Sequence, residues 1–404
     1  MPGEHPRRTG PAAPAARRRR AAAALLTLPL VVTVALVASC GTVGTEDRTL
    51  RHALPADADF THPGVLVGKD QLADVRKHVT AGRQPWLSAY LTMRDSEYGS
   101  YKYRPRPHGT VLCTGTRTGR GCAQERADAI AAYTQALLFT VTGKQQHAVK
   151  ARQIMDAWSG RLKGHGTRDA AWAASTWARA AEIVRHTPEA GWPAARVRRF
   201  EDMLRGVHLP AVSAKAPDSG GGQDLVMTDA AVSIAVFLDD HQAFDRALGR
   251  FRARVPAYFS GKNGVTQDTC RGLREVGRGI AATAHIAETA RHQGVDLYGE
   301  VEDRLRAALA LHARHRPGEP VPGARCGGRD GGTDGGVGGS AGKPGSGMGP
   351  GLEVALHHLE DRLGDSLPVA HRLAAGARPV GTDGLFVAWE TLTHAARPEA
   401  KTAG

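Results

Sequence analysis

Residues 225–238, LVMTDAAVSIAVFL, are apolar on almost every side of a helix. A helix of this kind has no face suited to water, so it must be buried among other helices. Its polar exceptions Asp229 and Ser233 are four residues apart and share one face. The glycine-rich residues 219–223 precede it, and such an elbow lets a ligand approach the helix N-terminus, which favours anions. The alternative is a plain loop that leads into a core helix.

Helical periodicity recurs from residue 69 onward, and short connections with glycine or proline separate the segments. We expect helices at residues 69–81, 85–93, 123–142, 145–162, 168–186, 193–207, 225–238, 241–255, 274–293, 296–315, 352–363, 368–375 and 385–396. Short connections between helices of similar length predict tandem antiparallel hairpins. The sequence therefore predicts an all-α fold, and large chains of this type commonly close into an α/α toroid.

The first 39 residues resemble a bacterial lipoprotein signal. A cluster of arginines at residues 7–20 precedes the apolar residues 21–37, and small residues lead to Cys40. We expect cleavage before Cys40, lipidation of this cysteine, and a polar tether at residues 40–60. The chain would then be exported and anchored to the outer face of the bacterial cytoplasmic membrane, or secreted. A plain secretory signal or a single membrane anchor is the alternative, and either also implies export.

The mature chain keeps four cysteines after Cys40: Cys113, Cys122, Cys270 and Cys326. An even number in an exported chain predicts two disulfides, for which three connectivities exist. Pairing of Cys113 with Cys122 would close a polar, glycine-rich hairpin that has no core of its own, and Cys270 with Cys326 would join two long loops. No CxxC or HExxH spacing occurs, so we expect neither a metal site nor a cofactor.

The chain is basic, with a formal net charge of +13, of which residues 1–39 supply +5. Export argues against nucleic acid as a partner, and an acidic polysaccharide or the cell envelope suits the remaining charge better. A generic solvated surface is the alternative. Residues 327–351 are a glycine-rich insert that cannot bury a core and contains no phosphate-binding GxxxxGK[ST] pattern. We expect one domain at residues 61–396, a monomer, with this insert inside it.

Six segments along this domain form one pattern: HPGVLVGKDQLADVR at 62–76, the segments 149–159, 172–182 (WAASTWARAAE) and 227–238, QDTCR at 267–271, and HIAETARHQGVDLY at 285–298. Together they resemble the alginate lyase-like family of polysaccharide lyases. The likeness covers residues 60–395 in one order, which is more specific than any single motif. It implies an incomplete α/α toroid and cleavage of a uronate-containing polysaccharide by β-elimination, a reaction for which no metal is obligatory.

The polar site departs from the family pattern. Arg271 matches, whereas Glu275 stands where the family has a histidine, and Gly222-Gln223 stand where it has an Asn-Trp pair. His165 and Asp169 replace a family asparagine and glutamine. The scaffold therefore matches well and the site poorly.

Four residues are candidates for the chemistry. Arg271 would pair with the substrate carboxylate, or is a salt-bridge partner beside a disulfide. Glu275 would act as a base if burial raised its pKa, or is a favourable first-turn charge. His165 is a second candidate base. Tyr258 would be the acid, although a tyrosine of the core is the alternative.

Four further residues are candidates for substrate binding. Gln223 would donate a hydrogen bond from the elbow, or is a solvated loop residue. Asp169, which with His165 replaces a family asparagine and glutamine, is a second polar candidate. Trp172 and Trp177 would stack on sugar rings, or belong to the core.

These features support three hypotheses. The first is an exported lyase that acts on an anionic polysaccharide. The second is a catalytically inactive glycan-binding lipoprotein on the same scaffold. The third is a glycoside hydrolase, since helical toroids also hold paired catalytic carboxylates. Asp169, Asp224 and Asp229 are the only candidate catalytic acids for this hypothesis.

Overall fold

The structure is a computed structural model that describes residues 51–113, 120–166, 168–214, 221–315, 321–324, 348–349 and 351–395, all within one unit of the chain, 48–404. The predicted signal peptide, Cys40 and nearly all of the glycine-rich insert lie outside these residues. The described residues are predominantly helical, which confirms the all-α prediction. None of the described helices is both long and apolar enough to cross a membrane.

Most helices follow one another as pairs. The helices are α1 Lys69–Thr80, α2 Trp86–Asp95, α4 Cys122–Thr142, α5 Gln145–Ser159, α6 Ala171–Arg185, α7 Ala194–Met203, α8 Leu209–Ser213, α9 Gln223–Phe237, α10 His241–Tyr258, α11 Leu273–His292, α12 Tyr298–His312, α13 Glu353–Leu356, α14 Pro368–Ala377 and α15 Glu390–His394. The only described strands, β1 Thr110–Val111 and β2 Gly164–His165, pair in parallel.

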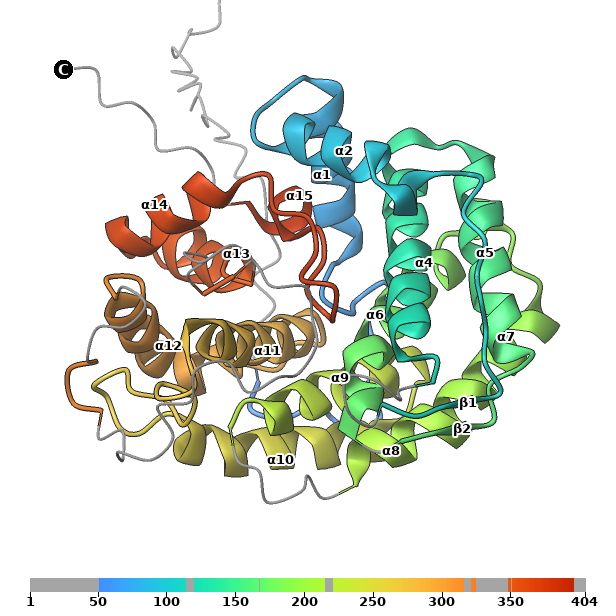
Figure 1. The fold of residues 1–404 in the computed structure, drawn as a ribbon. Helices are drawn as coiled ribbons and strands as arrows, with labels where there is room; N and C mark the ends of the chain where they lie inside the picture. Colours follow the sequence, from blue (N-terminus) through green and yellow to red (C-terminus); the bar gives the residue numbers. More distant parts are fainter. Residues whose placement is uncertain are drawn as a thin grey trace, which may run out of the picture. The chain divides into compact units, whose positions relative to one another are not determined.

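The helices form an inner and an outer set. Along the inner set α4 packs against α6, α6 against α9, α9 against α11, and α11 against α13, while α5, α10 and α12 cover them from outside (Figure 1). In α9 every residue from Asp224 to Phe237 is buried, whereas α7 buries only Phe200 and Met203. The prediction that residues 225–238 form a helix buried among other helices is therefore confirmed. Closure of the hairpins into a toroid stays a prediction.

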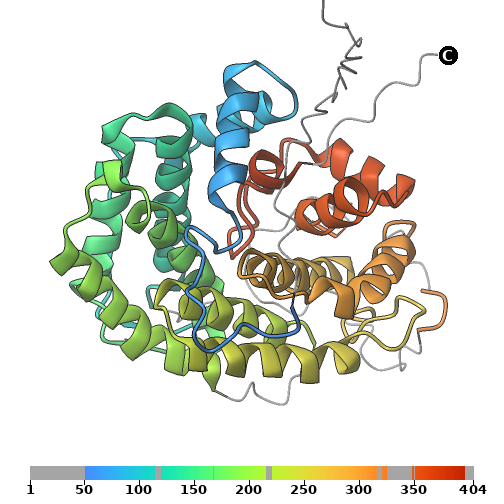
Figure 2. The same cartoon turned by 180° about the vertical axis from the view of Figure 1, so that it is seen from behind.

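The two ends of the inner helices differ. The segment 51–68 runs across their C-terminal ends, as Figure 2 shows from behind. There the Leu66 N–H donates to Thr289 Oγ1 at the end of α11, and His62 lies 2.8 Å from Glu182 near the end of α6. At the opposite end the first turns of α6, α9 and α11 carry the predicted site residues Trp172, Gln223 and Glu275.

Three predicted helices are wrong in extent. The one expected at 385–396 begins only at Glu390, because Asp383 Oδ1 accepts the backbone N–H groups of Leu385 and Val387 and holds this stretch in a turn. The one expected at 193–207 changes to a π-helical turn, Leu204–His208, after α7. The one expected at 352–363 has only α13 as α-helix, followed by a second π-helical segment, His357–Arg362.

The long segment between α2 and α4 is fixed at several points. Cys113 and Cys122 form the predicted disulfide, with their Cα atoms 5.6 Å apart. The buried Asp128 accepts hydrogen bonds from the Tyr103 hydroxyl, the Arg106 N–H and the Trp158 indole. These contacts hold the segment against α4 and α5.

The second predicted disulfide is described on one side only. Cys270 is disulfide-bonded, and its predicted partner Cys326 lies outside the described residues.

Candidate active site

The glycine elbow before α9 is held by the side chains of Gln267 and the buried Asp268. The Gly221 N–H donates to Gln267 Oε1 at 2.8 Å, and the Gly222 N–H donates to Asp268 Oδ2 at 2.7 Å. Gly221 has φ 78°, and a Cβ on it would overlap Asp268 Oδ1. A Cβ on Gly222 would come within 3.0 Å of Gly279 Cα on α11. Glycine is therefore required where the elbow packs against the start of α11.

Arg271 follows Asp268, which holds the elbow, and is largely exposed to solvent. Its Nη1 lies 3.2 Å from the buried Asp268 Oδ1, yet 55% of the Arg271 side chain is exposed. Burial raises the pKa of Asp268, although Arg271 and the Gly222 N–H oppose that shift. Gln223 is the first residue of α9 and is partly exposed beside the elbow. An exposed guanidinium at a helix N-terminus is suited to an anionic group.

Trp172 and Arg278 form the neighbouring part of the site, between the first turn of α6 and α11. The Arg278 guanidinium lies over the Trp172 ring, 5.7 Å from its centroid, in a cation–π arrangement. Arg278 Nη1 also pairs with Glu275 Oε1 at 2.8 Å, and the Trp172 indole donates to Asp169 Oδ1 at 3.3 Å. Trp172, Asp169 and Glu275 are all partly exposed, so they line the surface at this end of the helices.

Arg126 and Asp383 complete this charged group. Arg126, in the first turn of α4, is within electrostatic range of Asp169, Asp383 and Arg278. Burial raises the pKa of the Asp383 carboxyl to about 6, although Arg278 and two backbone N–H groups oppose that shift. A carboxyl with such a pKa changes its charge close to neutral pH, which is a common property of functional sites.

The sequence reasoning missed three of these residues: Arg126, Arg278 and Asp383. Arg278 lies on α11 and pairs with Glu275 three residues before it, so helical spacing from the predicted Glu275 was a signal for it. Arg126 and Asp383 come from distant segments, and nothing local in the sequence indicated them.

His165 and Trp177 are placed in a buried cluster around Glu125. Glu125 Oε2 lies 2.7 Å from His165 Nε2, and Oε1 lies 2.9 Å from His208 Nε2 and 3.4 Å from the Trp177 indole nitrogen. Burial opposes ionisation of Glu125, but the two histidines outweigh it and lower its pKa to about 2. The His165 side chain has no exposed surface, and its Nδ1 bonds to Gly166 O. This geometry makes His165 an ion-pair partner and Trp177 a core residue, against the base and stacking roles expected of them.

Tyr258 is also buried. Its hydroxyl packs against Gly279, and burial together with Asp268 raises its pKa well above the ordinary value. A fully buried phenol cannot meet a polymer at the surface, so the acid role expected for Tyr258 does not fit this structure.

Two of the three acids considered for hydrolysis form ion pairs with arginines. Asp229 Oδ2 lies 2.7 Å from Arg179 Nη2, and Arg179 also reaches His285 Nδ1 at 2.9 Å in the middle of the inner helices. Asp224 pairs with Arg250 and Arg254. These buried pairs leave Asp169 as the partly exposed acid of the three, so the structure brings no pair of them together across a surface.

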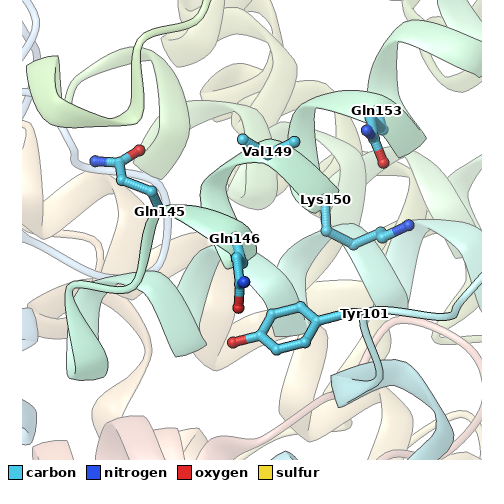
Figure 3. A pocket seen from close by; sticks show the side chains of 6 residues that line it. All are labelled: Tyr101, Gln145, Gln146, Val149, Lys150 and Gln153. Carbon is cyan, nitrogen blue, oxygen red and sulfur yellow. The ribbon is translucent and has the colours of Figure 1, made fainter.

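A hollow of about 420 Å³ lies elsewhere, on the outer side of α5 (Figure 3). Its lining residues are Tyr101, Gln145, Gln146, Val149, Lys150 and Gln153. Lys150 is its only charged lining residue, so this hollow lacks the arrangement of arginine, carboxylate and aromatic ring found at the inner helix ends.

The site therefore combines three functions in one place. The guanidinium groups of Arg271, Arg278 and Arg126 can neutralise an acidic substrate. Trp172 offers a ring for stacking, and Glu275 is a carboxylate that is 36% exposed in its side chain. Such a site can stabilise negative charge that develops on a bound anion and can accept a proton.

Comparisons with known proteins agree with this architecture. A family model described as alginate lyase matches residues 106–320. Among solved structures, alginate lyase A1-III of Sphingomonas species A1 is similar with a TM-score of 0.59 and 16% identity, covering 81% of this chain and 95% of that chain. A histidine-to-alanine variant of the A1-III enzyme in complex with a tetrasaccharide gives a TM-score of 0.59, 17% identity and the same coverage.

An alginate lyase from Bacteroides ovatus is also similar, with a TM-score of 0.50 and 10% identity, covering 64% of this chain and 85% of that chain. No curated protein sequence matches the chain. At these identities the solved structures establish a shared fold.

Proposed function

Because the chain belongs to the alginate lyase family, whose model matches more than half of its length, we propose that it cleaves an anionic, uronate-containing polysaccharide by β-elimination. The reaction takes place at the N-terminal ends of α6, α9 and α11. The observation that carries the proposal is the stacking of Arg278 on Trp172 beside Glu275, on the helix that the exposed Arg271 precedes by two residues.

The arginines supply the electrostatic part of the reaction. The proton on C5 of a uronate becomes acidic only when the adjacent carboxylate is neutralised, because negative charge builds up on that carboxylate as the proton leaves. Arg271 and Arg278 bind this carboxylate, and Trp172 stacks on a neighbouring sugar ring. The positive ends of α9 and α11 add to the same field.

Glu275 performs the proton transfer. Its carboxylate takes the C5 proton, the C5–H electrons form the C4=C5 double bond, and the C4–O4 bond breaks. The resulting Glu275 carboxylic acid then returns the proton to O4 of the leaving sugar, so one residue completes the elimination. Arg278, at 2.8 Å, orients this carboxylate.

A second function is favoured by one specific observation. His165 and Tyr258 are both buried, so neither of the side-chain types that such a reaction commonly uses is open at the positions expected for them. A protein with the arginines and Trp172 but without proton transfer would bind acidic glycans and leave them intact.

Incubation of the purified protein with alginate and other uronate polymers separates these functions. A lyase produces an unsaturated uronate, which absorbs ultraviolet light. New reducing ends without this absorbance would indicate hydrolysis, and binding with neither signal would establish the glycan-binding function and contradict the lyase.

Variants then locate the site. Arg271→Ala should lose most activity, because it removes the exposed guanidinium at the elbow. Arg198→Ala, which changes an exposed arginine of the outer helix α7, is the matched control and should retain activity. Full activity of Arg271→Ala would remove Arg271 from the site.

For the location of the protein, we propose export and attachment to the outer face of the cytoplasmic membrane through lipidated Cys40, as the signal-like residues 1–39 suggest. Radiolabelled palmitate should be incorporated into the wild-type protein and not into Cys40→Ser. Equal labelling of both would contradict lipidation at this residue.

A further inference from the structure

A cluster of metal-ligating side chains lies at the end of the inner helices opposite the proposed active site. His62 comes from the segment 51–68, and Glu182 and His186 are four residues apart on one face of α6. One ligand atom from each lies within 4.8 Å of the other two. No other group of three such residues occurs among the described residues.

One of the distances in this cluster is that between two ligands of one ion, and another is that of a hydrogen bond. Glu182 Oε1 lies 2.8 Å from His62 Nδ1 and 3.2 Å from His186 Nε2. In tetrahedral zinc with bonds of about 2.0–2.1 Å, neighbouring ligand atoms are about 3.3 Å apart. The two imidazole rings are stacked, with centroids 4.0 Å apart and planes inclined by 6°. Because a ligating imidazole holds its ion in the plane of the ring, both rings must rotate out of this parallel stack when an ion binds.

Asp239 supplies the support that a ligating histidine usually has. Its Oδ1 lies 2.9 Å from Nε2 of His62, the nitrogen that does not face Glu182. A carboxylate that accepts the second N–H of a histidine fixes the tautomer and ring orientation for metal binding through the first nitrogen. Nδ1 of His62 is therefore the nitrogen available for a metal.

One buried nitrogen in this cluster has no partner other than Glu182. Within the described part of the chain, His186 Nε2 is buried and makes no hydrogen bond, although it lies 3.2 Å from Glu182 Oε1. Glu182 itself has no exposed surface. A buried polar atom without a hydrogen bond is costly, and a bound ion would satisfy this nitrogen.

The charges around the cluster suit a divalent cation. Glu182 and Asp239 carry two negative charges, and Arg185 pairs with both Asp239, at 3.4 Å, and Glu201, at 3.0 Å. Arg185 and Glu201 cancel one another, so two negative charges remain when the imidazoles are neutral. Asp239 is 47% exposed in its side chain, which gives an ion access from solvent.

From this geometry we propose that His62, Glu182 and His186 bind one Zn²⁺ ion, with Asp239 orienting His62. Nitrogen and carboxylate ligands in this combination are those that zinc prefers. The ion would join the segment 51–68 to α6 and so fasten the N-terminal part of the domain across the helix ends. This role is separate from the proposed lyase reaction.

The competing arrangement has no metal. His62 would then be an imidazolium that bridges Glu182 and Asp239 by hydrogen bonds. The two arrangements differ in the role of His186. This histidine is a zinc ligand in the first arrangement, whereas the hydrogen bonds of His62 to Glu182 and Asp239 do not require it.

The test uses the full chain without a histidine tag, treated with a chelator and titrated with ZnCl₂ by calorimetry, with MgCl₂ as the comparison cation. We expect one zinc per chain by elemental analysis, a higher melting temperature with zinc, and no effect of magnesium. Asp239→Asn should weaken zinc binding about 10–100-fold. His186→Ala should abolish it, and His186→Gln, which keeps the packing against His62, should abolish it while the fold is retained.

The matched control is His371→Ala, since His371 pairs with a single carboxylate, Glu360, at 2.7 Å and has no second histidine in that pair. This variant should bind zinc as the wild type does. Absence of stoichiometric zinc in the wild-type chain, or equal binding by the wild type and His186→Gln, would overturn the proposal.

Discussion

Substitution of Gly221 by alanine tests the elbow on which the proposed active site is built. Gly221 has φ 78°, a conformation that costs an L-residue about 1–2 kcal/mol. The new Cβ would also overlap Asp268 Oδ1 and lie 2.9 Å from Arg271 Nη1. Asp268 must move away, which breaks its hydrogen bond to the Gly222 N–H and leaves a buried carboxyl without that partner, at about 1–3 kcal/mol. We expect Gly221→Ala to lower the free energy of unfolding by roughly 2–5 kcal/mol.

Gly294 is a matched control for the backbone part of this loss. It has the same φ of 78°, but a Cβ on it would meet no described atom within 4 Å. Gly294→Ala should therefore cost only about 1–2 kcal/mol. Gly249→Ala, at an exposed position inside α10 with no such contact, should raise stability by about 0.5–1 kcal/mol.

Urea unfolding followed by circular dichroism measures all three variants, and the midpoints give the differences in stability. Lyase activity should fall in Gly221→Ala, because Arg271 moves with Asp268, and should persist in Gly294→Ala. If Gly221→Ala and Gly294→Ala lose equal stability, the contact with Asp268 does not hold the elbow and the reasoning is refuted.

Three further predictions concern other parts of the domain. Burial raises the pKa of Asp383 to about 6. The neutral carboxyl therefore contributes stability at acidic pH, and about 1–3 kcal/mol of it is lost as the pH rises through 6. Asp383→Asn should remove this step from a plot of melting temperature against pH, and an unchanged step would assign it to another group. Trp172→Ala should raise KM for the polymer more than Trp172→Phe does, because phenylalanine keeps a ring for stacking; equal KM values would exclude stacking. Cys113→Ser should lower the free energy of unfolding by about 2–4 kcal/mol, as measured by thermal unfolding, because the Cys113–Cys122 disulfide closes the hairpin. No loss would show that Asp128 and its hydrogen-bond partners suffice to hold the hairpin.

Short-range features were predictable because they depend on neighbours in the chain. The buried character of α9 follows from the absence of a polar face, and the Gly143 stop of α4 follows from its left-handed φ of 67°. The Cys113–Cys122 pair is close in sequence, so its geometry is local as well. The helix expected at 385–396 was wrong because Asp383 captures backbone N–H groups that the helix would need.

The site residues show where local reasoning ends. Arg271 was expected from the resemblance to the family and is exposed beside the elbow, whereas its proposed partners Arg126 and Asp383 come from α4 and from the segment before α15. His165 and Tyr258 have the right chemistry for proton transfer, but packing buries them both. Burial and partners of a polar side chain are properties of its neighbours in space, which helical periodicity does not specify.

The sequence alone determined that this protein is a helical chain with one wholly buried inner helix, a short disulfide hairpin and the family pattern of phrases that follow one another from residue 60 to 395. Only the tertiary structure decided which polar groups meet. Arg278 reaches Trp172 from more than 100 residues away, and His62 reaches Glu182 from 120 residues away. The physical reason is that a turn of helix is set by hydrogen bonds between residues four apart. The convergence of side chains from different helices depends on how those helices pack, and this is set by contacts across the whole domain.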